Sequence, residues 1–183
     1  LKLANFSRFT AQASVIGPNG DFIFSFREDT RGANLADRPQ FLAHVGQDSG
    51  TRFIGPVQMG RVSGQSSFHM SRRINNPDGS LRGVASLAMG TDYFTDVFNR
   101  VSLEKMHFLL LGKDGIIRAT DKESLDLLGK NLTGGPIFQA MEKSPIEGRY
   151  INETLFTQAR RFISYRAVEG YPLVIGVSVD EAV

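Results

Sequence analysis

Two stretches of this chain that lie 95 residues apart are built on the same plan. GPNG at 17–20 and GKDG at 112–115 each lie between apolar, strand-like runs, which predicts a tight hairpin turn at both places. Further on, 71–89 and 164–179 share an order of parts: a serine, a basic strand end, a turn that contains glycine and a long apolar strand. The shared order predicts a duplicated module, with roughly 90 residues in each copy.

The first copy is predicted to begin with the end of a long helix over 1–12, because Leu1, Leu3, Phe6 and Phe9 have near-helical spacing. A hairpin follows, and its second strand, FIFSF at 22–26, puts three phenylalanines on one face that we expect to be core.

A short helix is then predicted at 36–47, with Asp37 as its N-cap and Pro39 in its first turn. Strands are expected at 52–59, 66–75 and 82–90, the last two joined by an NPDG turn.

A connecting helix is predicted directly after Asp92, which caps it, and its apolar stripe comprises Tyr93, Phe94, Val97, Phe98 and Val101. The second copy repeats the order of the first, with a hairpin at 106–119, a short helix at 136–144 and strands near 147–153, 161–168 and 172–179. Both copies are therefore predicted to be α+β modules with a five-stranded antiparallel sheet and flanking helices.

Composition excludes several classes of protein. The 183 residues include no cysteine, so disulfides, thiol nucleophiles and cysteine-ligated metals are absent. The net charge of +2 is too small to predict a nucleic-acid partner. The longest apolar run, HFLLL, is far shorter than the roughly 20 residues that span a bilayer. Since the chain starts inside a predicted helix and lacks an initiator methionine, we expect it to be a piece of a longer protein.

The sequence contains no pattern typical of catalysis or metal binding. His44, His69 and His107 are not at metal-ligand spacing, and His44 and His69 are better explained as polar residues at a helix surface or sheet edge. No GxSxG segment is present, and most carboxylates fall in turns or at helix starts. We therefore expect no catalytic residue, no metal, no cofactor and no enzymatic activity.

Binding is the function that remains. Arg38 opens the short helix, where its guanidinium can form a bidentate pair with a ligand carboxylate, and Asp92 can hold an amine. The pocket between them would be lined by Phe41, His44, Met59, His69 and Ser71. The alternative is structural: Arg38 pairs with Asp37 or with a carbonyl, and Asp92 is only a helix cap.

Three segments carry a resemblance to a known family: DRPQFLAH at 37–44, RRINNPDGSLRGVASLAMGTDYF at 72–94 and GRYINETLFTQARRFISYRAVEGYPLVIGVSV at 148–179. They resemble the double Cache domain, also described as a tandem PAS-like or PDC sensor. The resemblance implies a membrane-distal, ligand-binding module at 1–95 and a membrane-proximal, transmitting module at 96–183. It implies the periplasmic part of a bacterial inner-membrane signalling protein, most similar to those on GGDEF diguanylate cyclases and next to those on histidine kinases.

Amino-acid-binding members of that family carry an Arg-Pro-Trp-Tyr segment and a downstream Asp. Arg38, Pro39 and Asp92 match, whereas Gln40 and Phe41 replace the aromatic pair. The resemblance implies a small ligand of carboxylate or amine type in the first module, no polar pocket in the second, and a homodimer formed through the N-terminal helix. The alternative is an autonomous secreted or soluble PAS-like module that dimerises without a ligand.

Overall fold

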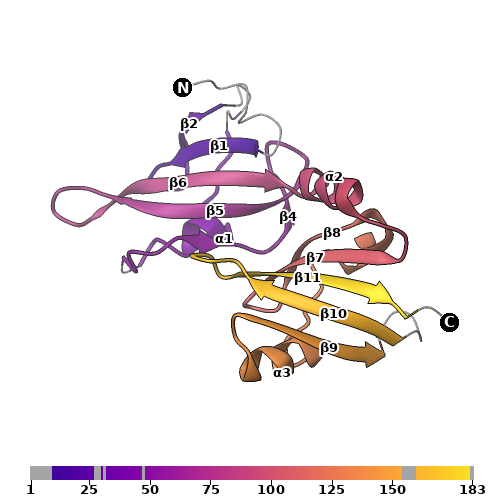
Figure 1. Ribbon diagram of the computed structural model, residues 1–183. Helices are drawn as coiled ribbons and strands as arrows, with labels where there is room; N and C mark the ends of the chain where they lie inside the picture. The colour runs from indigo at the N-terminus through magenta and orange to yellow at the C-terminus, as the bar shows by residue number, and fades with distance from the viewer. Residues whose placement is uncertain (1–9, 27–29, 31, 47, 154–159, 182–183) are drawn as a thin grey trace. The chain divides into compact units, whose positions relative to one another are not determined.

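The computed structural model describes residues 10–26, 30, 32–46, 48–153 and 160–181. The chain divides into two compact units, one that ends at Tyr93 and one that begins at Phe94. Each unit is an antiparallel sheet accompanied by few, short helices (Figure 1). Among the described residues, no helix is both long enough and apolar enough to cross a membrane.

The first unit contains a six-stranded sheet in the order β2-β1-β6-β5-β3, with β4 also paired to β5. Its strands are β1 (Thr10–Ile16), β2 (Phe22–Ser25), β3 (Phe53–Ile54), β4 (Gln58–Met59), β5 (Ser66–Asn75) and β6 (Leu81–Gly90). The helix α1 (Pro39–Leu42) lies in the segment between β2 and β3. The predicted single strand at 52–59 is thus two short strands, and the sheet has six strands rather than five.

The second unit contains a five-stranded sheet in the order β8-β7-β11-β10-β9. Its strands are β7 (Met106–Gly112), β8 (Ile117–Thr120), β9 (Glu147–Glu153), β10 (Arg160–Ala167) and β11 (Leu173–Asp180). It also has a 3₁₀ helix, η2 (Lys122–Leu127), and the helix α3 (Pro136–Lys143), while α2 (Thr91–Val101) follows β6 directly. Apart from the split strand, the two sheets have the same strand order, in agreement with the repeat in the sequence.

The prediction of a helix over 1–12 is wrong for residues 10–12, which are the part of this range that the structure describes. Thr10 begins β1, and residues 1–9 lie outside the described part of the chain. β1 is hydrogen-bonded to β2 on one side and to β6 on the other. This pairing outweighs the local spacing of apolar residues that predicted a helix. The homodimer predicted through that helix stays a prediction.

Two predicted helix caps are also wrong. Arg38, not Asp37, is the N-cap of α1, and no side chain makes a capping hydrogen bond there. Asp37 instead accepts two hydrogen bonds from Arg61, which lies 24 positions further along the chain. α2 begins at Thr91, so Asp92 lies in its first turn rather than before it.

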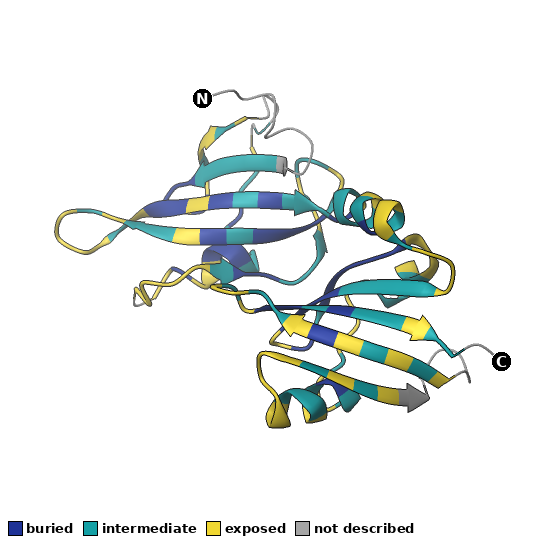
Figure 2. Ribbon diagram, in the orientation of Figure 1, coloured by how far each residue is buried: buried dark blue, intermediate teal, exposed yellow. Residues whose placement is uncertain are grey.

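Each unit has its own core between the sheet and the segment that carries the short helix. The first core contains Ile16, Leu35, Phe41 and Val84, and the second contains Leu111, Ile117, Ile137, Tyr165 and Val174. Figure 2 shows buried positions on α1 and on the neighbouring strands β5 and β6. Of the three phenylalanines of FIFSF that we expected in the core, only Phe22 packs against it. Because β2 is an edge strand, Phe24 and Phe26 are 50% and 56% exposed and contact each other.

Candidate functional site

The first unit has a very small cavity where the sequence predicted a binding site. Arg38, Met59 and His69 are among its lining residues, together with the loop from Gly60 to Ser63. Its volume is about 10 Å³, which leaves space for about one water molecule. The structure therefore brings three of the seven predicted residues together around a closed site.

The other four predicted residues lie elsewhere. Phe41 is part of the apolar core. His44 and Ser71 are both buried, and His44 Nε2 lies 3.0 Å from Ser71 Oγ within hydrogen-bonding distance. Asp92 is exposed on α2 and is not among the residues that line the cavity. The predicted amine-binding residue thus does not line the cavity that Arg38 lines.

Arg38 is bonded to neutral groups. Its Nη1 donates to Gln58 Oε1 at 2.9 Å, and Gln58 Nε2 donates to Gln40 Oε1 at 2.8 Å. Within the described part of the chain, Arg38 forms no ion pair, because the carboxylate of Asp37 is held by Arg61 at 2.8 Å. The alternative in which Arg38 pairs with Asp37 is therefore not what the structure contains.

The two histidines of this unit are held in their neutral forms. His69 is 8% exposed, and its Nδ1 lies 3.2 Å from Ser86 Oγ. Burial, and then the positive charge of Arg38, lower the pKa of His69 to about 4. Burial also lowers the pKa of His44, although its hydrogen bond with Ser71 acts in the opposite direction.

A loss of stability at mildly acidic pH follows from the pKa of His69. Between pH 6.5 and about 4 the unfolded chain binds a proton at this residue that the folded chain does not, so the free energy of unfolding falls as the pH falls through this range. The expected contribution is about 3 kcal/mol over the whole range, of which about 2 kcal/mol falls between pH 7 and pH 5. Denaturant unfolding from pH 7 to pH 5 should show a steeper decline for wild type than for His69→Asn, with His44 contributing to both curves. Parallel curves would show that His69 is not the group responsible.

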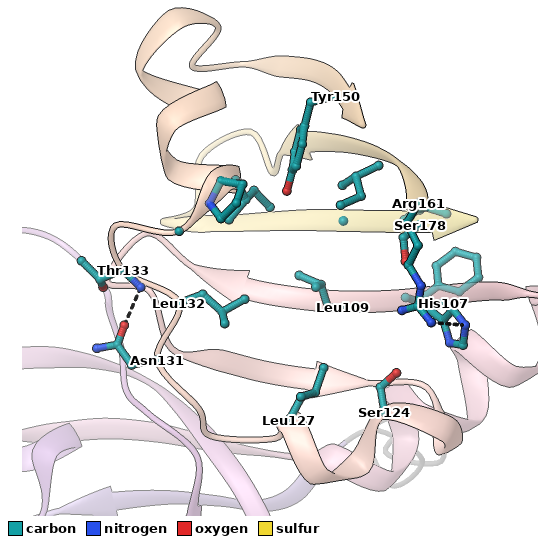
Figure 3. Close-up of a pocket in the computed structure, with 17 residues that line it drawn as sticks. His107, Leu109, Ser124, Leu127, Asn131, Leu132, Thr133, Tyr150, Arg161 and Ser178 are labelled. Carbon is teal, nitrogen blue, oxygen red and sulfur yellow. Dashed lines mark hydrogen bonds between the residues drawn. The ribbon is translucent and has the colours of Figure 1, made fainter. Parts of the chain in front are cut away.

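The second unit contains a much larger cavity, of about 230 Å³, although the family resemblance implied no polar pocket there. It lies between β7, η2, the loop after η2, α3 and the strands β9 to β11 (Figure 3). Most of its wall is aliphatic, formed by Leu109, Leu127, Leu132, Ile137, Ile163 and Val177.

A cluster of polar groups around a charged side chain lies at one end of this cavity, and Asn131 and Thr133 line the opposite end (Figure 3). Arg161, His107 and Ser178 lie together in this cluster (Figure 3). Arg161 donates through Nε to Asp180 Oδ1, and its Nη2 lies 3.3 Å from His107 Nε2. Because an arginine can only donate, His107 Nε2 accepts in this pair, and the hydrogen-bond network places the proton on Nδ1.

His107 Nδ1 is buried and has no hydrogen-bond partner among the described residues. Its nearest carboxylate oxygens, on Asp121 and Glu123, are both 3.8 Å away, which is too far for a hydrogen bond. The polar end of the cavity thus combines one arginine with three nearby carboxylates, those of Asp180, Asp121 and Glu123.

The two cavities occupy corresponding places in the two units. Gln12 on β1 and His107 on β7 are 95 residues apart, and each lines the cavity of its own unit. Their strand partners, Ala88 and Ser178, line the same cavities. The repeat alone could have indicated this equivalence, but no motif in the sequence distinguishes Tyr150 or Arg161 as lining residues.

Similarity to known proteins was found at the level of structure. No protein-family model matches the sequence, and no curated protein matches it significantly. The chain is similar to the extracellular domain of a protein described as a histidine kinase, rpHK1S-Z16, with 26% identity and a TM-score of 0.86 over 98% of this chain and 74% of that one.

Two further similar structures are sensor domains from named bacteria. The ligand-binding domain of the Pseudomonas aeruginosa amino-acid chemoreceptor PctB, in complex with L-Arg, is 17% identical with a TM-score of 0.70, over 99% of this chain and 75% of that one. The sensor domain of the Vibrio cholerae histidine kinase DctB is 16% identical with a TM-score of 0.59, over 95% and 73%. The chain thus has the fold of extracellular, Cache-like sensor domains of membrane receptors.

Proposed function

We propose that this chain is the extracytoplasmic sensing region of a membrane-anchored signalling protein, and that it binds a small molecule and has no catalytic activity of its own. The observation that supports this proposal most strongly is the likeness to the extracellular domain of rpHK1S-Z16, which extends over 98% of the chain with a TM-score of 0.86. The similar structures are sensor domains rather than catalytic domains.

The output domain is proposed from two sources. The sequence resemblance favours a diguanylate cyclase, whereas the likeness to rpHK1S-Z16 favours a histidine kinase. The coding sequence on either side of the chain tests the proposal. A membrane helix before Leu1, another after Val183 and a cytoplasmic signalling domain beyond it are expected. A complete gene without flanking membrane helices would instead support the autonomous PAS-like module.

In the first unit, we propose Arg38 as the anchor for a ligand carboxylate. Its guanidinium is bonded to the neutral amide of Gln58, and its charge is not offset by an ion pair among the described residues. A carboxylate can replace that amide and form a stronger, charge-assisted bond. The cavity of about 10 Å³ must widen to admit it, by movement of the Gly60–Ser63 loop that Arg61 ties to Asp37.

The expected result for Arg38→Ala is a loss of carboxylate binding with a smaller effect on folding. Removal of one charged hydrogen-bond partner should weaken binding by about 2 kcal/mol, or roughly thirtyfold. A thermal-unfolding screen with L-alanine, GABA, lactate, succinate and ethanolamine identifies a compound, and calorimetric titration compares the variants.

Arg72→Ala is the matched control, because Arg72 carries the same charge and is exposed on β5. Equal affinities for wild type and Arg38→Ala would remove Arg38 from the site.

A further inference from the structure

The cavity of the second unit contains a hydrogen-bond donor that has no partner among the described residues. The hydroxyl of Tyr150, on β9, points into the cavity (Figure 3). It makes no hydrogen bond with any described residue, unlike the neighbouring Tyr165, whose hydroxyl donates to Ser144 O at 2.8 Å. Burial, and then the nearby Tyr165, raise the pKa of Tyr150 to about 12, so its hydroxyl keeps its proton at neutral pH.

A second set of donors lies at the polar end. Arg161 uses Nε for Asp180 and Nη2 for His107, and its Nη1 has no partner among the residues that the structure describes. The side chain of Arg161 is only 11% exposed, so few waters can reach the remaining N–H groups. A molecule in the cavity that offers oxygen acceptors would satisfy both Tyr150 and Arg161.

The charges around this end disfavour an anion, and the donor groups and apolar wall of the cavity disfavour a cation. Asp180 already neutralises Arg161, and the carboxylates of Asp121 and Glu123 lie close behind His107. An added anion would approach these three carboxylates at short range. An added cation would face Arg161 and the donor groups of the lining, and most of the wall offers no polar atom to solvate a charge.

We propose that the second unit binds an uncharged, mostly apolar molecule that carries one or two carbonyl oxygens, of the ketone, ester or lactone class. The aliphatic wall receives the hydrocarbon part, and Tyr150 and Arg161 each offer a donor to a carbonyl oxygen at their own part of the cavity (Figure 3). This site goes beyond the function proposed above, because it is separate from Arg38 and differs from it in the chemistry of its ligand.

Three probes of equal length and different charge test the ligand class: 2-hexanone, hexanoate and hexylamine. Thermal unfolding and calorimetric titration are measured on the whole 183-residue chain. The expected result is that 2-hexanone raises the melting temperature and binds more tightly than either charged probe. No shift with 2-hexanone, or an equal or larger shift with hexanoate or hexylamine, would overturn the proposal.

Tyr150→Phe tests the location of the site, since it removes only the hydroxyl that faces the cavity. We expect it to weaken 2-hexanone binding about threefold to tenfold, the range for a neutral hydrogen bond, and to leave the melting temperature almost unchanged. Tyr165→Phe is the matched control. It removes the hydrogen bond to Ser144, so it should lower the melting temperature and leave the affinity for 2-hexanone as it is. Unchanged affinity in Tyr150→Phe overturns the assignment.

The two proposals fail in different ways. If 2-hexanone binds the chain but no ligand alters the output of the complete protein, the sensing function is wrong and this site stands. If a carboxylate acts through Arg38 and 2-hexanone does not bind, the sensing function stands and this site is wrong.

Discussion

Asp114→Ala is expected to lower the free energy of unfolding by about 3 to 5 kcal/mol, because it removes the carboxylate that pairs with a buried arginine. Arg118 on β8 is 1% exposed, and its two terminal nitrogens donate to the two carboxylate oxygens of Asp114 at 2.7 and 2.6 Å. Ile116 O accepts a further bond from Arg118, but a carbonyl cannot offset the charge. Denaturant unfolding of wild type and variant measures the difference.

A matched control is available on the same unit. Asp126 also pairs with a basic residue four positions away, Lys130, but both side chains are about half exposed or more, so Asp126→Ala should cost less than about 1 kcal/mol. Burial opposes the ionisation of Asp114, but its bonds with Arg118 outweigh this, and the pKa of Asp114 is lowered. The stability that it contributes is therefore present near neutral pH and is lost as the pH falls through that lowered pKa. Similar losses for Asp114→Ala and Asp126→Ala would contradict the importance of burial.

Gly20→Ala is expected to cost about 3 to 4 kcal/mol, from backbone strain together with steric overlap. Gly20 has a φ of 89°, and a Cβ at this position would lie 2.5 Å from the backbone nitrogen of Ala36. The turn between β1 and β2 packs directly against the loop that precedes α1, so neither backbone can move aside easily. Thermal and denaturant unfolding measure the loss.

Gly79→Ala separates the two causes. Gly79 has a similar φ of 82°, but nothing lies within 4 Å of the position that an alanine methyl group would occupy, so this variant suffers strain alone and should lose only about 1 to 2 kcal/mol. If the two variants lose the same amount, the close approach of Ala36 makes no contribution.

The two hairpins and the repeated strand order could be predicted because they depend on local signals. Glycine turns at 17–20 and 112–115 separate apolar strands, and such turns specify their hairpins without help from the rest of the chain. Features that depend on distant partners were not predictable. Thr10 is in a strand because it pairs with β6, which lies more than 70 positions further along the chain. Asp37 does not cap its helix because its carboxylate is hydrogen-bonded to Arg61.

The candidate sites show the same limit. The sequence indicated Arg38 because a guanidinium at a helix start can pair with a ligand carboxylate, and its role in binding stays a prediction. The second cavity exists because Tyr150 and the surrounding leucines do not fill the space between β7, α3 and β9. Such a gap depends on how side-chain volumes pack in three dimensions, which the sequence pattern does not show. His44 and Ser71 lay in the predicted set, but their contact with each other depends on a strand register that spacing alone does not reveal.

The position of the first and last strands in each sheet bears on how such a chain can evolve. Met106 at the start of β7 is paired with Val179 near the end of β11, and Thr10 of β1 is paired with Met89 of β6. The chain therefore enters and leaves each unit at neighbouring points, and a gene segment that encodes one unit can be copied or exchanged without division of a sheet. One copy can then acquire a new ligand preference through substitutions in its own lining while the other keeps its chemistry.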